Sequence, residues 1–351
     1  MRVPHSLATA AVSLALAGGV TVISGVTVSG AALAQDTDVT VALLRLTSSS
    51  PIFIAHEKGY FEEEGLNVEL VFVDAAVAAP TAVVSGDADF AVTGATAGFF
   101  NQAGQGALTI IGAQSREEPG YQLVAYVAGN EAYENGLTSP EDLPGHSIGM
   151  TTVGSTFHYA MGALADHLGF DLEEVELVPL QGLGNMNTAL IGGQVDAILT
   201  VVNIANQLEA EGSGHIIGWV ADYTPWQLGV LLTSPDNVEN NREMVEAFVR
   251  GYQRGATDYY NAFLANRDAD GNLQPGEGYE ETLAIMAEVL GQPAERIANG
   301  LPFIDPMGRL DVGNLYHQVE WWQSQGLVNA DVNLDDFLDL SFIEGHFNLP
   351  E

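Results

Sequence analysis

Small polar residues gather just after the β-rich runs of this sequence, in two separate stretches of the chain. Hydroxyl and amide groups there, next to the free N–H groups of helix N-termini, can hold a small polar or anionic ligand without bond chemistry. The candidates are Thr47, Ser48, Ser49, Ser50, Thr93, Gly94, Thr96, Gly154, Ser155, Thr156 and Asn203. Each Ser or Thr can equally be a plain helix cap, and their clustering at corresponding places favours binding.

Charged and aromatic residues extend this candidate site. Arg116 can pair with a carboxylate or sulfonate of a ligand, or with an adjacent glutamate on a solvated turn; Arg45 is another of the nine arginines in the chain. Phe157 and Trp226 can stack on a planar ring or lie in the core. Gln227 follows Trp226 and joins the candidate set. Sulfonates, carboxylates and pyrimidine-like compounds therefore all stay open as ligands.

Covalent and metal chemistry find little support in the sequence. The chain has no cysteine, which excludes disulfides, thiol catalysis, cysteine-ligated zinc and iron–sulfur clusters. The histidines lack metal-ligand spacing, and neither a glycine-rich phosphate loop nor a nucleophile elbow is present. We therefore predict no catalytic residue, no metal ligand and no cofactor.

One stretch follows the spacing of a calcium-binding loop. Asn266, Asp268, Asp270 and Glu277 place oxygen atoms at the loop's first, third, fifth and last positions, and Gly271 occupies the turn. Asn266 replaces the usual first aspartate and removes one charge. A polar surface loop between two helical segments is the favoured interpretation, with a calcium site as the alternative.

The candidate residues lie in two stretches of the chain that are related by an internal sequence repeat. Residues 81–93 align without gaps on residues 188–200, and residues 68–71 align on 175–178, both at an offset of 107 residues. Two ungapped blocks at one offset are a poor match to chance, so we expect two similar halves.

Each half alternates short β-rich runs with helical segments, which indicates parallel sheets with right-handed crossovers. The predicted strands are 39–43, 68–73, 90–93, 147–150, 175–178 and 197–201, and the predicted helices are 52–64, 79–85, 157–168 and 186–191. From Arg242 onward the pattern is mainly helical, and we expect this tail to pack on the first half.

The predicted fold class is α/β, with two parallel-sheet lobes joined by crossing strands at a hinge. Residues 35–120 and 232–351 are assigned to the first lobe with its C-terminal helices, and residues 121–231 to the second. Segments 114–116 and 224–227 leave the two lobes at corresponding places and are hinge-side candidates. A ligand would sit in the cleft, beyond the carboxyl ends of the strands.

The charge balance is strongly acidic. Ten Lys and Arg residues against 46 Asp and Glu give a formal charge of −36, which makes nucleic acid an unfavourable partner. Lys58 is the single lysine, and a lysine-poor, carboxylate-rich surface is what we expect of a protein working in high salt, where repulsion is screened. An ordinary acidic protein is the alternative.

The first 34 residues have the order of a signal peptide. Arg2 and His5 precede an uncharged stretch from Leu7 to Ala34, which ends in small residues. We predict cleavage after Ala34 and export, with retention of the stretch as a membrane anchor as the alternative.

Three segments together resemble a known family. Residues 54–69, 85–90 and 192–197 are similar to the solute-binding proteins of ABC importers in the nitrate, sulfonate, taurine and thiamine-pyrimidine-precursor group. The resemblance implies a type II periplasmic binding protein, a monomer that captures a small anionic or heteroaromatic solute and delivers it to a membrane-embedded ABC permease. The alternative is an exported enzyme of the thiamine-pyrimidine branch. Enzymes of that branch rely on a cysteine-rich motif, and this chain has no cysteine.

Overall fold

The computed structural model describes residues 36–348 of the chain. The predicted signal peptide and its cleavage site lie outside the described residues. The chain from Gln35 onward forms one compact unit. Within residues 36–348, no helix combines the length and the apolar composition needed to cross a bilayer.

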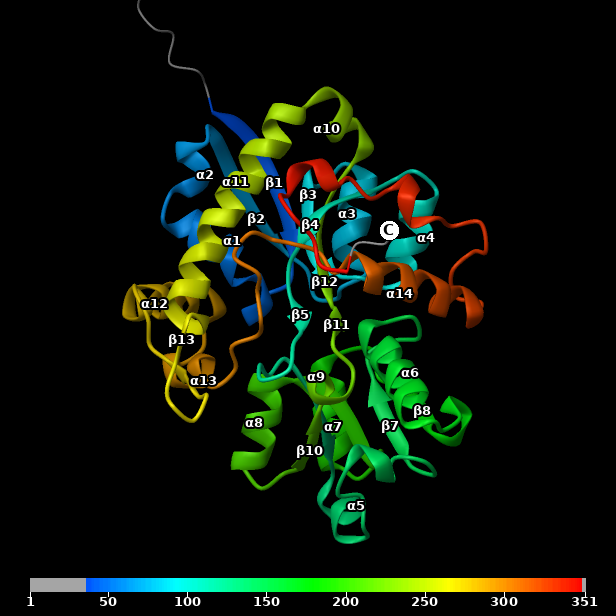
Figure 1. Cartoon of the computed structure of the whole chain (residues 1–351). Helices are drawn as coiled ribbons and strands as arrows, with labels where there is room; N and C mark the ends of the chain where they lie inside the picture. Colours follow the sequence, from blue (N-terminus) through cyan, green and yellow to red (C-terminus); the bar gives the residue numbers. More distant parts are fainter. Residues whose placement is uncertain (1–35, 349–351) are drawn as a thin grey trace, which may run out of the picture. The chain divides into compact units, whose positions relative to one another are not determined.

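The first sheet has five strands in the order β2-β1-β3-β12-β4. Its strands are β1 (Thr37–Leu43), β2 (Leu66–Phe72), β3 (Phe90–Gly94), β4 (Thr109–Ala113) and β12 (Gly229–Thr233). β1 runs parallel to β2 and β3, whereas β12 runs antiparallel to both β3 and β4. A strand that follows the whole second sheet in the sequence therefore lies between β3 and β4 in this sheet (Figure 1).

The second sheet also has five strands, in the order β10-β6-β9-β7-β8. Its strands are β6 (Val124–Ala128), β7 (Ser147–Met150), β8 (Glu176–Pro179), β9 (Ala197–Val201) and β10 (His215–Trp219). β7 runs parallel to β8 and β9, and β6 runs antiparallel to β9 and β10. The predicted α/β class with two mostly parallel sheets is confirmed.

The two halves repeat in atomic detail. The backbone N–H of Thr40 donates to a carboxylate oxygen of Asp89 at 2.8 Å, and that of Ser147 donates to Asp196 at the same distance. Both pairs are separated by 49 residues, and they lie at the predicted offset. The repeat found in the sequence is therefore a repeat of structure.

Helices follow the strands as predicted, with one exception. The helices of the first half are α1 (Ser50–Glu57), α2 (Tyr60–Glu63), α3 (Ala78–Ser85) and α4 (Ala97–Gly104). Those of the second half are α5 (Asn130–Glu134), α6 (Thr156–Leu168), α7 (Leu183–Ile191), α8 (Val202–Ala210) and α9 (Val220–Tyr223). The helix predicted over 52–64 is divided into α1 and α2, because Gly59 adopts a left-handed backbone with φ of 72°.

The C-terminal part is mainly helical. Its elements are α10 (Pro235–Asn240), α11 (Arg242–Tyr259), a π-helical turn (Tyr260–Leu264), β13 (Asn266–Arg267), β14 (Leu273–Gln274), α12 (Tyr279–Leu290), α13 (Ala294–Ala298) and α14 (Val312–Ser324). α11 packs on the first half as expected: the Phe248 ring stacks between Phe61 and Phe90, with centroids 5.4 and 3.9 Å away. α14 does not pack on the first half alone, as was expected of the C-terminal part. Its Trp321 ring lies against Gly162 of α6 in the second half, so close that a Cβ atom on Gly162 would lie 1.8 Å from the ring.

Two short strands connect the sheets. β5 (Arg116–Glu117) and β11 (Trp226–Gln227) pair antiparallel and lie between the two sheets in Figure 1. The segments predicted to lie at a hinge supply these strands. The domain boundary predicted after residue 231 falls inside β12.

Residues 266–277 form the β13–β14 hairpin and the turn after it. One Asp268 carboxylate oxygen accepts the backbone N–H groups of Asp270 at 3.0 Å and Asn272 at 2.9 Å. The other accepts the side-chain amide of Gln274 at 3.1 Å. The hydrogen bonds of this carboxylate are thus made within the hairpin, which favours the polar-loop interpretation.

Candidate functional site

A cavity of about 310 Å³ opens beyond the carboxyl ends of the strands and is lined from both halves. From the first half it takes the segments after β1, β2, β3 and β4, and from the second the segments after β7, β8 and β9. This is the place at which open α/β sheets bind ligands, and its volume suits a small molecule.

Helix N-termini converge on the cavity. The segments leading into α3, α4, α6 and α7 all line it. The Thr96 hydroxyl caps α4 by accepting the N–H of Phe99 at 3.2 Å, and the Ser155 hydroxyl caps α6 by accepting the N–H of His158 at 3.4 Å. The positive ends of these helix dipoles favour polar or anionic ligand groups.

Part of the predicted set lines this cavity. The lining residues predicted from the sequence are Ser48, Thr93, Gly94, Thr96, Ser155, Thr156 and Phe157. The two halves touch at this point: a Cβ atom on Gly94 would lie 2.7 Å from Cγ2 of Thr156, so only glycine fits. Phe157 is buried and offers an apolar surface in the cavity.

Other predicted residues lie near the cavity without lining it. Thr47, Ser49 and Ser50 are buried in the turn that starts α1, where the Ser50 hydroxyl donates to the Thr47 carbonyl at 2.7 Å. The Gly154 carbonyl accepts the N–H of Ala97 from the first half at 3.0 Å. These residues lie within two residues of lining residues in the sequence but do not themselves line the cavity.

Asn203 also lies outside the cavity lining. Its amide donates to the Gln292 side chain at 3.1 Å, between α8 and the segment after α12. Asn203 therefore joins the second half to the C-terminal helices.

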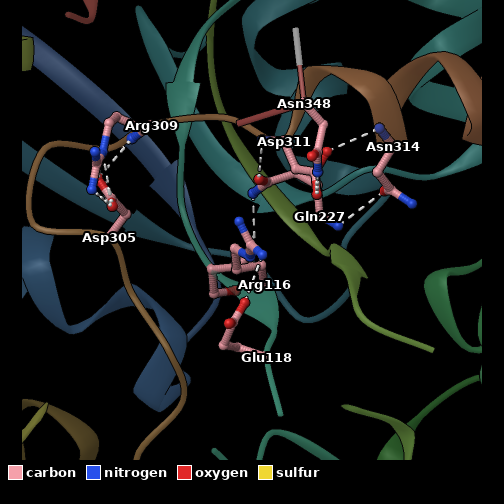
Figure 2. Close-up of polar contacts among 9 residues, drawn as sticks. Arg116, Glu118, Gln227, Asp305, Arg309, Asp311, Asn314 and Asn348 are labelled. Atoms are coloured by element: carbon pink, nitrogen blue, oxygen red, sulfur yellow. Dashed lines mark hydrogen bonds and ion pairs between the residues drawn. The ribbon is translucent and has the colours of Figure 1, made fainter. Parts of the chain in front are cut away.

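Arg116 does not line the cavity. Its guanidinium pairs with the Glu118 carboxylate at 2.6 Å (Figure 2). The guanidinium also lies 4.7 Å from the centroid of the Phe347 ring. Pairing with an adjacent glutamate, the alternative left open by the sequence, is the contact seen here. Its role as the anion partner of a ligand stays a prediction.

Trp226 and Gln227 belong to the crossing strands. Trp226 is buried against Tyr159, with ring centroids 4.8 Å apart. The Gln227 side-chain oxygen accepts the backbone N–H of Asp311 at 3.0 Å, and the backbone N–H of Gln227 donates to the Asn314 side-chain oxygen at 2.9 Å, as Figure 2 shows. These bonds join β11 to the start of α14.

Gln114 and Gln181 are among the cavity residues that the sequence did not nominate as ligand contacts. Gln114 is buried, and its amide lies 3.4 Å from the Ser48 hydroxyl and 3.3 Å from that of Ser49; its place in a hinge-side segment was the available signal. Gln181 has a φ of 70° and is one of two non-glycine residues with positive φ among the described residues. Such strained backbone often marks a functional site, and the sequence carries no sign of it.

The charged side chains at this cavity are Arg45 and Asp74, and both are exposed. The Arg45 guanidinium lies over the Phe72 ring, 3.7 Å from its centroid, and donates to the Val289 carbonyl at the end of α12. The buried lining is therefore neutral, with hydroxyl and amide groups as its hydrogen-bonding partners.

A wider hollow of about 610 Å³ lies between the β13–β14 hairpin and α9. Its charged residues, Asp222 and Arg267, are both exposed, and the first turns of α3, α4, α6 and α7 do not reach it. We therefore place the candidate site in the smaller cavity.

Comparison with known proteins adds the family. The family model described as "NMT1/THI5 like" matches residues 46–262. The formylaminopyrimidine-binding protein of Halalkalibacterium halodurans is 24% identical over 80% of this chain and 84% of its own length. The taurine-binding periplasmic protein of Escherichia coli is 27% identical over 67% of this chain and 69% of its own.

A solved structure agrees in fold. The alkanesulfonate-binding protein SsuA of Xanthomonas axonopodis pv. citri, bound to MOPS, aligns with a TM-score of 0.68 and 16% identity. The alignment covers 88% of this chain and all of that one. The fold is that of the periplasmic binding proteins, and the chain belongs to the NMT1/THI5-like family.

Proposed function

We propose that this protein is the extracytoplasmic solute-binding protein of an ABC importer. It captures a small anionic or heteroaromatic solute between its two halves and delivers it to a membrane-embedded permease. The observation that carries the proposal is the cavity at the carboxyl ends of both sheets, where four helix N-termini and neutral hydrogen-bonding side chains converge. Capture in such a cavity needs no bond chemistry.

The lining supports the solute class. Helix dipoles, the hydroxyls of Ser48 and Thr96 and the amide of Gln114 suit a sulfonate, a carboxylate or a heterocycle with several acceptors. Phe157 gives a planar ring an apolar surface. Arg45 at the edge could approach an anion if it left the Val289 carbonyl.

Closure is part of the proposal. The lobes, residues 35–120 with 232–351 and residues 121–231, turn about β5 and β11 as a monomer. The bond from Ala97 N–H to the Gly154 carbonyl and the contact of Gly94 with Thr156 hold the lobes together in the closed form. The leader up to Ala34 is removed on export to the periplasm.

The first test identifies the solute. The mature protein is purified, its bound small molecules are determined by mass spectrometry, and taurine, an alkanesulfonate, nitrate and a formylaminopyrimidine are titrated by calorimetry. We expect one of these classes to bind at one site and to be recovered unchanged. Conversion of the bound compound would support the exported enzyme instead, and absence of binding by every class would contradict the proposal.

A second test blocks closure. Gly94→Val places a side chain where Thr156 now packs, so the lobes cannot meet. We expect affinity for the identified solute to fall at least about tenfold, or about 1.4 kcal/mol. Gly98→Ala is the matched control, because Gly98 is exposed in α4 and a Cβ atom there meets nothing closer than 3.9 Å. Unchanged affinity in the Gly94→Val variant would place the solute elsewhere.

A further inference from the structure

His158 has a specific hydrogen-bonding state. It lies in the first turn of α6 with 8% of its surface exposed, and its Nδ1 atom is 3.1 Å from the backbone nitrogen of Gly154. A backbone N–H only donates, so Nδ1 must be the acceptor. The imidazole is therefore neutral, with its proton on Nε2.

The partner of His158 lies at the junction of the two halves. Gly154 has a φ of 80° in the loop between β7 and α6, and the neighbouring Thr152 and Ser155 line the cavity. While its N–H donates to His158, its carbonyl accepts the N–H of Ala97 in the first half at 3.0 Å. The His158 backbone N–H also donates to the Ser155 hydroxyl. His158 thus holds the loop at two points, at Gly154 through its ring and at Ser155 through its backbone N–H.

The surroundings of the ring disfavour its charged form. The rings of Trp321 and Trp322 on α14 meet it edge to face, with centroids 5.7 and 5.5 Å away. The titratable residues of α14 are Tyr316, His317 and Glu320: His317 and Glu320 are exposed, the Tyr316 hydroxyl donates to Asp335, and α4 carries none. Burial lowers the pKa of His158.

We propose that His158 is a positioning residue for the solute cavity: its neutral imidazole holds Gly154, and through Gly154 the loop that joins the second half to the first. The inference rests on the proposed function, since it assigns a role at the same cavity. Protonation of Nδ1 would set an N–H against the Gly154 N–H, break the bond and release the loop. Solute affinity therefore falls when the pH drops through the pKa of His158, and it holds at neutral pH.

The test uses three variants of the mature protein. His158→Asn places an amide oxygen near the position of Nδ1 and does not titrate, whereas His158→Ala removes the acceptor. His167→Asn is the matched control, because His167 lies on the same helix and is exposed. Amide hydrogen exchange at Gly154 and Ala97, and the imidazole nitrogen chemical shifts, are measured by NMR across the acid-to-neutral range, without solute and with taurine.

We expect the protection factor of both amides, the ratio of the intrinsic to the observed exchange rate at the same pH, to fall roughly tenfold in His158→Ala and in the wild type at acid pH. His158→Asn should stay protected throughout, and His167→Asn should follow the wild type. Equal exchange in His158→Ala and the wild type, or an acid response that persists in His158→Asn, overturns the proposal. If the exchange pattern holds but no solute class binds, the proposed function fails and the positioning role stands.

Discussion

At the scale of single residues, Glu117 is the most unusual group in the described chain. It lies in β5, is fully buried, and neither of its carboxylate oxygens has a hydrogen-bond partner. Burial raises the pKa of Glu117 well above its ordinary value, and the charge of Asp222 adds to the rise. An ionised carboxylate would be costly at this place.

We expect Glu117→Gln to raise the free energy of unfolding, and to do so more at high pH. A carboxyl with a raised pKa binds its proton more tightly in the folded state. The wild type therefore loses stability as pH rises above the unfolded pKa of about 4.3. The variant has no such loss, so its advantage should grow to about 1 to 2 kcal/mol by neutral pH.

Urea unfolding at several pH values checks this, with Glu131→Gln as the control because Glu131 is exposed in the first turn of α5. A stability difference between variant and wild type that does not change with pH would show that Glu117 is not protonated preferentially in the folded state.

Residue chemistry could be predicted only in part. The sequence could predict that four residues line the cavity, because strand ends and helix starts can be recognised in it. They are Ser48, Thr96, Ser155 and Thr156. Arg116 pairs instead with Glu118, since the choice between a ligand and a neighbouring carboxylate depends on the path of β5 after folding. That path is set by contacts with β11, more than a hundred residues away.

At the scale of elements, the duplicated aspartates show how each half is fastened. Asp89, just before β3, accepts a backbone N–H of β1, and Asp196, just before β9, accepts one of β7. Asp196 also accepts the Ser147 hydroxyl at 2.9 Å and lies 3.4 Å from His146. Burial opposes its charge, but the Ser147 and His146 contacts outweigh burial and lower the pKa of Asp196.

We expect Asp89→Ala and Asp196→Ala each to lower the free energy of unfolding by about 1 kcal/mol at neutral pH, because both lose a backbone hydrogen bond. For Asp196, whose folded pKa is lowered, the contribution is complete above the unfolded pKa of about 3.9 and disappears as pH falls through the folded value. Asp87→Ala, on an exposed turn, is the control for chemical unfolding. No loss in either variant would contradict this account.

Element prediction succeeded where the signal is local. All six predicted strands overlap observed strands, with each end within two residues, because β-rich runs and glycine ends mark them. The insertion of β12 between β3 and β4 could not be predicted from periodicity, because strand order depends on long-range pairing.

At the scale of the whole molecule, the main feature is the large excess of negative charge. The formal charge is −36, and basic groups are engaged locally: the single lysine, Lys58, contacts Asp258 at 2.8 Å and Glu281 at 3.0 Å. The remaining carboxylates greatly outnumber their partners, so the folded state carries a large self-repulsion at low ionic strength.

We predict that the melting temperature rises between about 0.1 and 2 M NaCl, since the Debye length falls from about 10 Å to under 3 Å over that range. Differential scanning calorimetry measures this. Sucrose serves as the control, because it strengthens burial without screening charge. A melting temperature that does not respond to NaCl would identify an ordinary acidic protein and remove the high-salt interpretation.

The position of β12 between β3 and β4 has a consequence for biosynthesis. While the ribosome is still making residues before Gly229, β3 and β4 have no strand to lie between them, and each leaves an open edge. The nascent polypeptide cannot finish its first sheet until about two thirds of the chain has been translated. Every strand of the second sheet, by contrast, ends at or before Trp219, so the second half can complete its sheet before the first half does.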